Sequence, residues 1–471
     1  MSWASAASRA EGDRVVRDGS EAAGQRPGFA LLLTVSMAQF MVVLDFTIVN
    51  VALPSVQHDL GMSATLLQWV VSAYAVAFGG FLLLGGRLAD VYGRTRLFRV
   101  GLILFVLASA SGGLAVEPGL LIASRVVQGI GAAVVAPASL ALVVTSWRGE
   151  QERGRALGTY GAVTSAGFAS GAILGGLLAE VTWRLVFFVN IPVGIVLVAA
   201  SCRLLPLDPP RRGGQLDVPG AVTVTAGIGL LVLAVTQAGD TLRVAQPAIF
   251  GAAAIVALAA FVARERTAPA PLLSLPALRD RHVAGASLSL VAVGGFNASQ
   301  VLLSALYLQE GRGLSPVLAG VCFLPFAAGS FALSGPAGRL VPALGSRRGL
   351  STGMALAVVS LAAAASAVLA GSLPGLLAGQ FGIGVAARLC QVSGTLAGTR
   401  GSAAARYQGT ASGLLNATRQ CGAALGVAIV SAALVALPGP FTHRVAAAMY
   451  ITVGFAVAGW LAAHIVPDRS S

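Results

Sequence analysis

The chain alternates between long apolar runs and short breaks that carry charge. Runs of about 20 apolar residues are long enough to cross a bilayer as helices, and the alternating pattern of barrel strands is absent. The runs predict fourteen spanning helices near 29–53, 66–86, 97–115, 119–142, 156–179, 185–204, 217–237, 246–263, 284–308, 316–337, 350–370, 373–396, 410–436 and 446–465. We therefore expect an all-α polytopic membrane protein.

Composition supports this class and argues against others. The 471 residues are 56% hydrophobic and 10% charged, whereas about a quarter of the residues in soluble proteins are charged. The net charge of +13 comes from arginines that lie mostly in loops, so no nucleic-acid partner is expected. The sequence has no ATP-binding glycine loop and no triad of catalytic residues, and its four cysteines lack metal-site spacing. No enzyme activity, cofactor or metal is expected.

The distribution of arginine predicts the topology. If the N-terminus lies inside, the loops expected outside hold only Arg184, Arg243, Arg312 and Arg444, and most other arginines fall on the inner side. Cytoplasmic loops carry an excess of basic residues. Both termini are therefore expected in the cytoplasm, with the protein in a bacterial inner membrane.

A weak internal repeat divides the chain. Gly86-Arg87-Leu88 with Gly93 recurs as Gly338-Arg339-Leu340 with Gly345, an offset of 252 residues. Duplicated halves are common in transporters. The expected division is a cytoplasmic tail (1–28), a six-helix bundle (29–208), two extra helices with an inner loop (209–280) and a second six-helix bundle with a short tail (281–471).

Asp45 is the feature of the first span that needs an explanation. A carboxylate deep in an apolar segment costs a few kcal/mol, so it usually faces a polar cavity or a partner. Arg125, inside the fourth span, needs a partner for the same reason. With this offset, Asn297 is the position equivalent to Asp45, and Leu377 is the position equivalent to Arg125. The ionisable pair therefore occurs only in the first half. A permanent structural ion pair remains the alternative to a functional one.

The inner loop after the second span runs from Gly85 to Arg96 and combines glycines with an acid and several arginines. Glycines let helix ends approach closely, and a carboxylate can pair with an arginine or a helix N-terminus. We expect Gly86, Asp90, Gly93 and Arg94 to form a latch between moving parts, the alternative being an ordinary basic loop.

These motifs together resemble the major facilitator superfamily. Gly86 to Arg94 is similar to its inner-loop signature, and Leu44 to Pro54 resembles the first-helix signature of its fourteen-span drug:proton antiporter branch. Arg125 to Gly131, Thr182 to Gly194 and Gly409 to Gly426 resemble its fourth, sixth and thirteenth helices. The resemblance implies two six-helix bundles plus two helices, with Arg125 and Asp45 involved in proton coupling.

The fifth span resembles the antiporter motif of that branch, with one departure. Its glycines are Gly167, Gly171, Gly175 and Gly176, and Ala172 stands where the motif has proline. Without that proline the helix is expected to be straighter. Close helix packing would by itself explain the glycines.

The second half contains polar residues in apolar spans but no deep acid. The candidates for a substrate cavity are Asn297, Gln300, Tyr307, Gln380, Asn416, Gln420 and Arg419. Arg388 also lies within one of these apolar spans. Hydrogen bonding between helices is the alternative for each. We expect a neutral, zwitterionic or anionic amphipathic substrate, or a cation that relies on Asp45 alone.

The sequence thus predicts a monomeric, proton-coupled exporter of drug-like or antibiotic-like molecules that needs no cofactor besides the proton gradient. Its expected partners are a small-molecule substrate, protons and the lipid bilayer. An importer or facilitator of a metabolite is the alternative within transport. A transporter-like sensor without flux is the alternative of another class, and a large added soluble domain would mark it.

Overall fold

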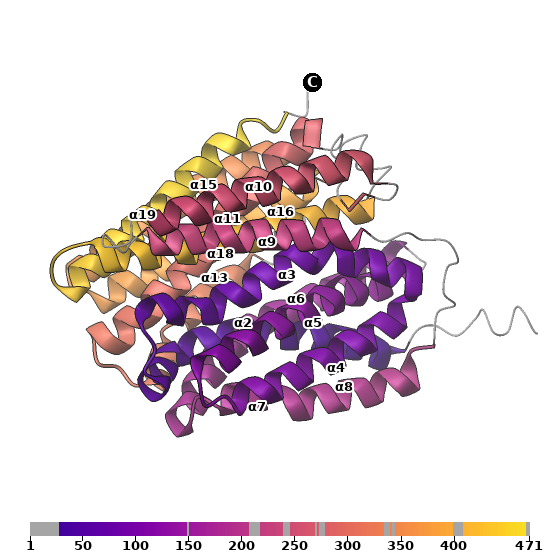
Figure 1. The fold of residues 1–471 in the computed structure, drawn as a ribbon, viewed down its shortest axis with the longest axis horizontal. Helices are drawn as coiled ribbons and strands as arrows, with labels where there is room; N and C mark the ends of the chain where they lie inside the picture. Colours follow the sequence, from indigo (N-terminus) through magenta and orange to yellow (C-terminus); the bar gives the residue numbers. More distant parts are fainter. Residues whose placement is uncertain are drawn as a thin grey trace, which may run out of the picture.

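The computed structural model is helical throughout its described part, which comprises residues 28–147, 150–206, 217–238, 245–268, 271–272, 278–333, 340–341, 344–398 and 408–467. The long helices run side by side, roughly along the long axis of the molecule, and no strand occurs within these ranges (Figure 1). The predicted all-α fold is confirmed. The tail before residue 28 lies outside the described residues.

The first half consists of six spans with short connections. Its helices are α2 (Phe29–Leu60), α3 (Ala64–Tyr92), α4 (Arg94–Gly113), α5 (Pro118–Ser146), α6 (Glu150–Val181), α7 (Leu185–Phe188) and α8 (Asn190–Leu204). Helix α2 ends at Gly61, whose φ of 59° suits glycine, and the Ser63 hydroxyl accepts a bond from the Leu66 amide at 3.2 Å to begin α3. This turn returns the chain across the membrane.

Two further helices and the second half follow. They are α9 (Val218–Gln237), α10 (Ala245–Thr267), α11 (Arg281–Leu306), the π-helical η2 (Tyr307–Gly311), α12 (Pro316–Val321), α13 (Leu324–Ala332), α15 (Ser346–Leu369), α16 (Leu373–Gly398), α18 (Gln408–Ala436) and α19 (Phe441–Ala463). Each predicted span meets one helix or a consecutive pair. The span expected at 316–337 is broken between α12 and α13, just before Pro325, which has no amide proton to continue α12.

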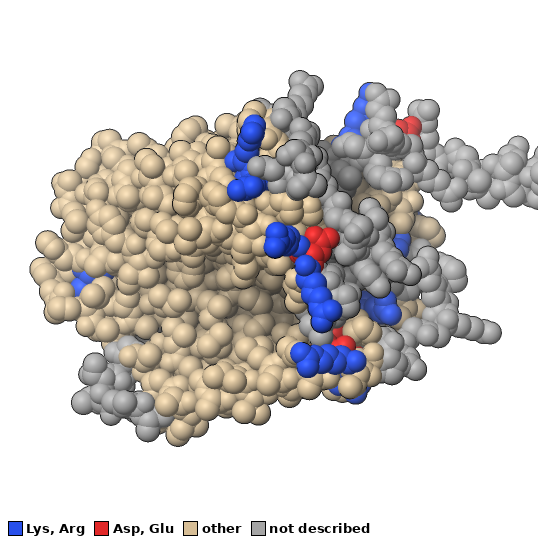
Figure 2. Space-filling model, turned by 90° about the horizontal axis from the view of Figure 1, so that it is seen from above, with Lys and Arg blue, Asp and Glu red and all other residues tan. Residues whose placement is uncertain are grey.

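The helices have the length and composition of membrane spans. Within the described residues, 11 helices are long and apolar enough to cross a membrane. Figure 2 shows charged side chains gathered toward the right-hand end, beside a long surface to the left that is almost free of them. This is the charge distribution of a multi-pass membrane protein.

The connection that carries the inner-loop motif is shorter than the sequence suggested. Helix α3 continues through Tyr92, and Gly93 alone separates it from α4. The φ of Gly93 is 96°, and that of Gly345, its counterpart in the repeat, is 89°. Glycine tolerates this region and other residues rarely do. The two halves thus share a backbone turn that requires glycine, in line with the repeat.

The ends of the two halves that are predicted to lie outside pack together. One hydrophobic core contains Val49 and Leu53 of α2 together with Leu302 and Phe323 of the second half. The Gln309 side-chain amide also donates to the Val51 carbonyl oxygen at 2.9 Å. The structure is therefore closed at the end that the arginine distribution predicts to lie outside.

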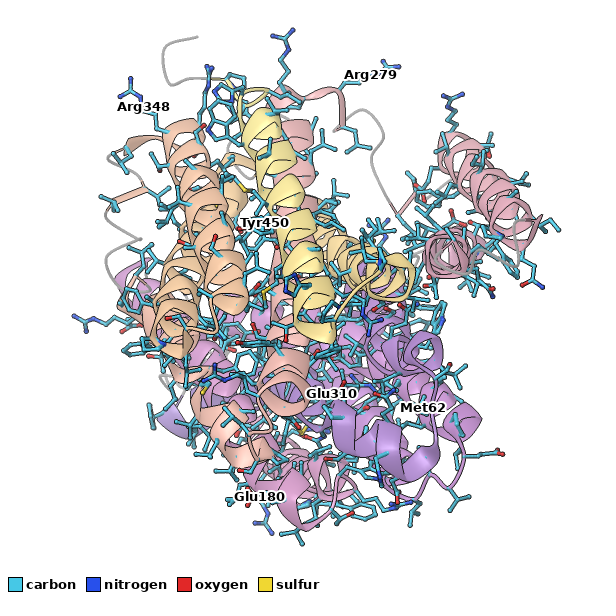
Figure 3. The ribbon with its side chains drawn as sticks, turned by 90° about the vertical axis from the view of Figure 1, so that its left-hand side faces the viewer. Met62, Glu180, Arg279, Glu310, Arg348 and Tyr450 are labelled. Carbon is cyan, nitrogen blue, oxygen red and sulfur yellow. The ribbon has the colours of Figure 1, made fainter. Side chains whose placement is uncertain are left out.

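The two extra helices lie along one side of the molecule. In Figure 3 they form a separate pair at the upper right. Helix α9 packs against both α3 and α18, whereas α10 packs mainly against α9. The buried Gln68 amide donates to the Thr236 hydroxyl, which ties α9 to α3. Helix α9 thus covers the line where the two halves meet at α3 and α18.

Candidate functional site

A row of glycines on α6 positions helix α2 and its carboxylate. The place of a Cβ on Gly167, Gly171 and Gly175 lies 2.8 to 2.9 Å from backbone carbonyl oxygens of α2. One of these oxygens belongs to Leu44, the neighbour of Asp45. Because a methyl group would not fit there, the glycines let the two backbones touch. Gly176 lies against Pro316 and Val317 of α12, so the same row also reaches the second half.

Asp45 and Arg125 form a buried ion pair. The Arg125 Nη1 donates to the Asp45 Oδ2 at 2.7 Å, and the two side chains are 1% and 0% exposed. Ions removed from water lose several kcal/mol of hydration each, which only close contact and further hydrogen bonds offset. The structure thus brings together the two residues that the sequence singled out. They lie 80 positions apart in the chain, on α2 and α5.

Gln128 links both members of the pair. Its Nε2 donates to the Asp45 Oδ1 at 2.7 Å, and its Oε1 accepts a bond from the Arg125 Nη1 at 2.6 Å. Gln128 lies one helical turn after Arg125 on α5, so the two side chains share a face. The amide therefore fixes the relative orientation of the carboxylate and the guanidinium.

Helix α3 holds the other side of the guanidinium. The Arg125 Nε donates to the Val70 carbonyl oxygen at 2.9 Å, and the guanidinium carbon lies 4.3 Å from the centre of the Tyr74 ring. A guanidinium is attracted to the face of an aromatic ring. Arg125 thus connects α3 and α5 to the carboxylate on α2.

Two residues whose roles the sequence did not predict complete the site. The Asn190 amide at the start of α8 donates to the Asp45 Oδ1 at 2.8 Å and to the Ser109 hydroxyl of α4 at 3.0 Å. Ser109 in turn donates to the Phe187 carbonyl oxygen at 2.8 Å. Both are polar residues in apolar spans, a signal that could have marked them, but only the fold shows that they face Asp45.

Among the latch residues, Gly93 and Arg94 lie at the junction of α3 and α4, and Gly86 lies within α3 before that junction. The place of a Cβ on Gly86 is 3.8 Å from Pro137 of α5, an ordinary contact, whereas Gly85 lies directly against the backbone of Ala133. The close approach thus occurs one residue earlier than the motif glycine. The side chain of Asp90 lies outside the described part of the structure, and the latch stays a prediction.

The second-half candidates fall into different environments. Tyr307 belongs to the hydrophobic core at the closed outer end rather than to a polar surface. Gln420 packs against Gly79 of α3, and Arg419 donates to the Asn416 side-chain oxygen at 3.0 Å. Gln300 donates to Ser304 at 3.0 Å, while the Asn297 Oδ1 and both amide atoms of Gln380 are buried without a partner among the described residues. The structure therefore separates Tyr307 from the others.

The duplicated helical bundles and the charged site buried between helices define a polytopic membrane transporter. The chain belongs to the Major Facilitator Superfamily, whose family model matches residues 35–427. The family predicted from the sequence motifs is thereby confirmed.

Similar proteins of known activity are export and resistance proteins. The puromycin resistance protein of Streptomyces alboniger is 40% identical over 417 residues, which cover 85% of this chain and 80% of that protein. The cephamycin export protein of Amycolatopsis lactamdurans is 38% identical over 422 residues, covering 85% of this chain and 83% of that protein. These relatives confirm the efflux function predicted from the sequence.

A solved structure shows the same fold. A bacterial homologue of the human lysosomal transporter Spinster, in an inward-facing and occupied conformation, superposes with a TM-score of 0.66. The match covers 94% of this chain and 97% of that chain at 15% sequence identity. The predicted architecture of two six-helix bundles with two additional helices is confirmed.

Proposed function

We propose that this protein is a proton-driven exporter of amphipathic drug-like or antibiotic-like molecules. It works by alternating access in the bacterial inner membrane, with both termini in the cytoplasm, as a monomer that needs no cofactor. The observation that carries the proposal is the Asp45–Arg125 ion pair, which is wholly buried and held by side chains from several helices. The named export and resistance relatives support the substrate class and the direction of transport.

Protonation of Asp45 is the proposed coupling step. A neutral carboxyl group would lose its charge attraction for Arg125, in a site where low polarity makes such attraction strong. Arg125 also bonds to the Val70 carbonyl oxygen, so a change in its position is transmitted directly to α3. The charge of one side chain can thereby bias the equilibrium between two arrangements of the bundle.

The packing of the ends predicted to lie outside supports an order of events in the proposed cycle. Asp45 is 0% exposed, and the outer ends of both halves are packed together. A proton arriving from outside would therefore need the outer ends to separate first. Opening to each side in turn would let the carboxyl group take up a proton outside and release it to the cytoplasm while the substrate moves outward.

Asp45→Asn tests this function directly. Asparagine keeps the shape but cannot carry a proton, so in inside-out vesicles with an imposed pH gradient we expect accumulation of exported dyes to be lost. Asp59→Asn is the matched control, because Asp59 lies on the same helix but pairs with Arg184 at the outer end. Its transport should stay at the wild-type level. Equal gradient-driven transport by Asp45→Asn and wild type would reject Asp45 as the proton carrier.

The same vesicles separate the alternatives. An importer would move its substrate in the opposite direction, and a facilitator would equilibrate it without the pH gradient. A sensor without flux would show no transport of any compound in either vesicle orientation. The buried ion pair favours proton coupling over a facilitator, because a facilitator has no need of a charge that changes.

A further inference from the structure

Asp45 is fully buried and already accepts three hydrogen bonds. Its Oδ1 accepts bonds from Gln128 and Asn190, and its Oδ2 accepts the bond from Arg125. The side chain is not exposed, and its charge is balanced by the adjacent guanidinium. A cationic substrate that relied on Asp45 would have to displace Arg125. The expectation of a cation bound by Asp45 alone therefore has no support in this geometry.

The second half is positively charged and almost free of acids. Residues 281–467 contain a single acidic residue, Glu310, and it lies in η2 at the outer end. Arg388 on α16 and Arg419 on α18 lie within spans and are half-buried. Neither has a carboxylate partner among the described residues. An arginine inside a span is costly without such a partner.

Both arginines lie where the second half meets the first. The Arg388 Nη2 is 3.8 Å from the place of a Cβ on Gly161, so its guanidinium reaches helix α6. Its Nε has no hydrogen-bond partner among the described residues. Arg419 is bonded to the neutral Asn416 amide, and the next residue, Gln420, packs against α3. The two cations thus flank the region between the halves with their charge unbalanced.

Uncharged groups without partners lie deeper in the same half. Gln380 is 1% exposed, and neither its oxygen nor its nitrogen has a hydrogen-bond partner in the described structure. The Oε1 of Gln300 and the Oδ1 of Asn297 are likewise buried and unbonded. In the repeat, Gln380 is equivalent to Gln128 and Asn297 is equivalent to Asp45. The first half also leaves buried polar atoms without partners, among them the Asn190 Oδ1, so what distinguishes the second half is that such amides occur together with two arginines that have no carboxylate partner among the described residues.

We propose that the exported compounds carry an anionic group, which Arg419 and Arg388 bind, while Gln380, Gln300 and Asn297 bond to uncharged polar substituents. The inference rests on the proposed export function and specifies its substrate class. A carboxylate or sulfonate supplies the negative charge that would balance the guanidinium groups. Charge-assisted hydrogen bonds are about twice as strong as neutral ones. The planar fork of an arginine can also donate two parallel bonds to two oxygens of either group.

The test compares two dyes that differ in one charged group. 1-Anilinonaphthalene-8-sulfonate is anionic, and N-phenyl-1-naphthylamine is the same skeleton without the sulfonate. Binding of each is measured with the full-length protein in phosphatidylcholine nanodiscs, after subtraction of empty nanodiscs. We expect the wild type to favour the sulfonate, and Arg419→Gln or Arg388→Gln to weaken sulfonate binding about tenfold, which corresponds to one charge-assisted contact. Binding of the neutral dye should not change.

Two variants serve as controls. Arg444→Gln removes the same charge from the outer side of the same half, where Arg444 bonds to the Leu434 carbonyl oxygen, and it should leave both dyes unaffected. Arg419→Lys keeps the charge and should recover part of the sulfonate affinity. Retained binding of the neutral dye shows that each variant is folded.

The outcomes distinguish this inference from the export function. Equal affinity of the wild type for both dyes, or unchanged sulfonate binding in both arginine variants, would overturn the anion site. Displacement of the sulfonate by phosphatidylglycerol, with no transport of the sulfonate, would assign the site to lipid and overturn it too. Gradient-driven accumulation in inside-out vesicles reports on export separately. Its absence for every dye would reject the export function while a selective sulfonate site could still stand.

Discussion

Asp45 accepts hydrogen bonds from Arg125, Gln128 and Asn190, which belong to two other helices. These donors take the places that water molecules would occupy around the carboxylate if the residue were exposed. The ionised carboxylate is therefore tolerated in the span because the protein replaces its hydration. The counterpart Asn297 needs no such shell, since an uncharged amide costs far less to bury. The charge, more than the position, accounts for the polar cluster in the first half.

At this scale we predict a difference between two glutamines that the repeat relates. Gln128→Leu removes a donor to Asp45 and an acceptor for Arg125, and it should lower stability by about 1–3 kcal/mol, because buried charged groups lose their partners. Gln380→Leu removes a side chain without partners among the described residues and should be neutral or stabilising. Thermal unfolding of purified protein measures both. Similar losses in the two variants would show that the network around Asp45 does not stabilise the fold.

Helices α2 and α6 pack with their backbones in contact. Gly171 lies against the Leu44 carbonyl oxygen and the Thr47 side chain, and Gly175 lies against Ile48. In the second half Gly422 and Gly426 make the same kind of contact with Val291 and Gly295 of α11. The glycine motif therefore has a packing role in both halves. Helix α6 is continuous over 32 residues, and the straightness expected from Ala172 in place of proline stays a prediction.

For these elements we predict that Gly171→Ala destabilises the protein by about 1–3 kcal/mol, since a methyl group would lie 2.8 Å from a backbone oxygen that cannot move independently. Gly454→Ala on α19 is the control, because nothing lies within 4 Å of its added Cβ. There alanine should be neutral or slightly stabilising through its higher helix propensity. Thermal melting in detergent compares the two, and equal melting temperatures would argue against the tight contact.

The whole molecule is closed, at the end that is predicted to lie outside, by contacts between its halves. The Gln309 amide donates to the Val51 carbonyl oxygen at 2.9 Å, and Gly176 of α6 lies against Pro316 of α12. Alternating access requires these contacts to separate while the two bundles rock as bodies. The α9–α10 pair rests mainly on α3 and α18, so it is placed to follow that motion.

At this scale we predict that fixing the outer closure stops transport. In a background without native cysteines, Val51→Cys with Gln309→Cys should be linked by a short bifunctional maleimide, because the two positions are in contact. The linked protein should lose gradient-driven dye accumulation in inside-out vesicles, while each single variant treated alike should retain it. Full transport by the linked protein would mean that these outer contacts do not open during the cycle.

The sequence by itself determined the class of protein and most of its spans. Uninterrupted apolar runs can only be satisfied as helices in lipid, since each backbone polar group must bond within its own segment. The two deep charges were also visible because charged residues are rare in such runs, and the glycine motifs were visible through their spacing. This is why Asp45 and Arg125 were identified without a structure.

Only the tertiary structure decided what surrounds those charges and what the second half lacks. Ser109 and Asn190 join Asp45 because α4 and α8 pack beside α2 and α5, an arrangement that depends on contacts far apart in the chain. Tyr307 was expected near a cavity and lies in the core, since a hydroxyl on a large apolar ring is compatible with either place. Run length and composition are local properties, whereas the partner of a buried polar atom is set by packing between helices.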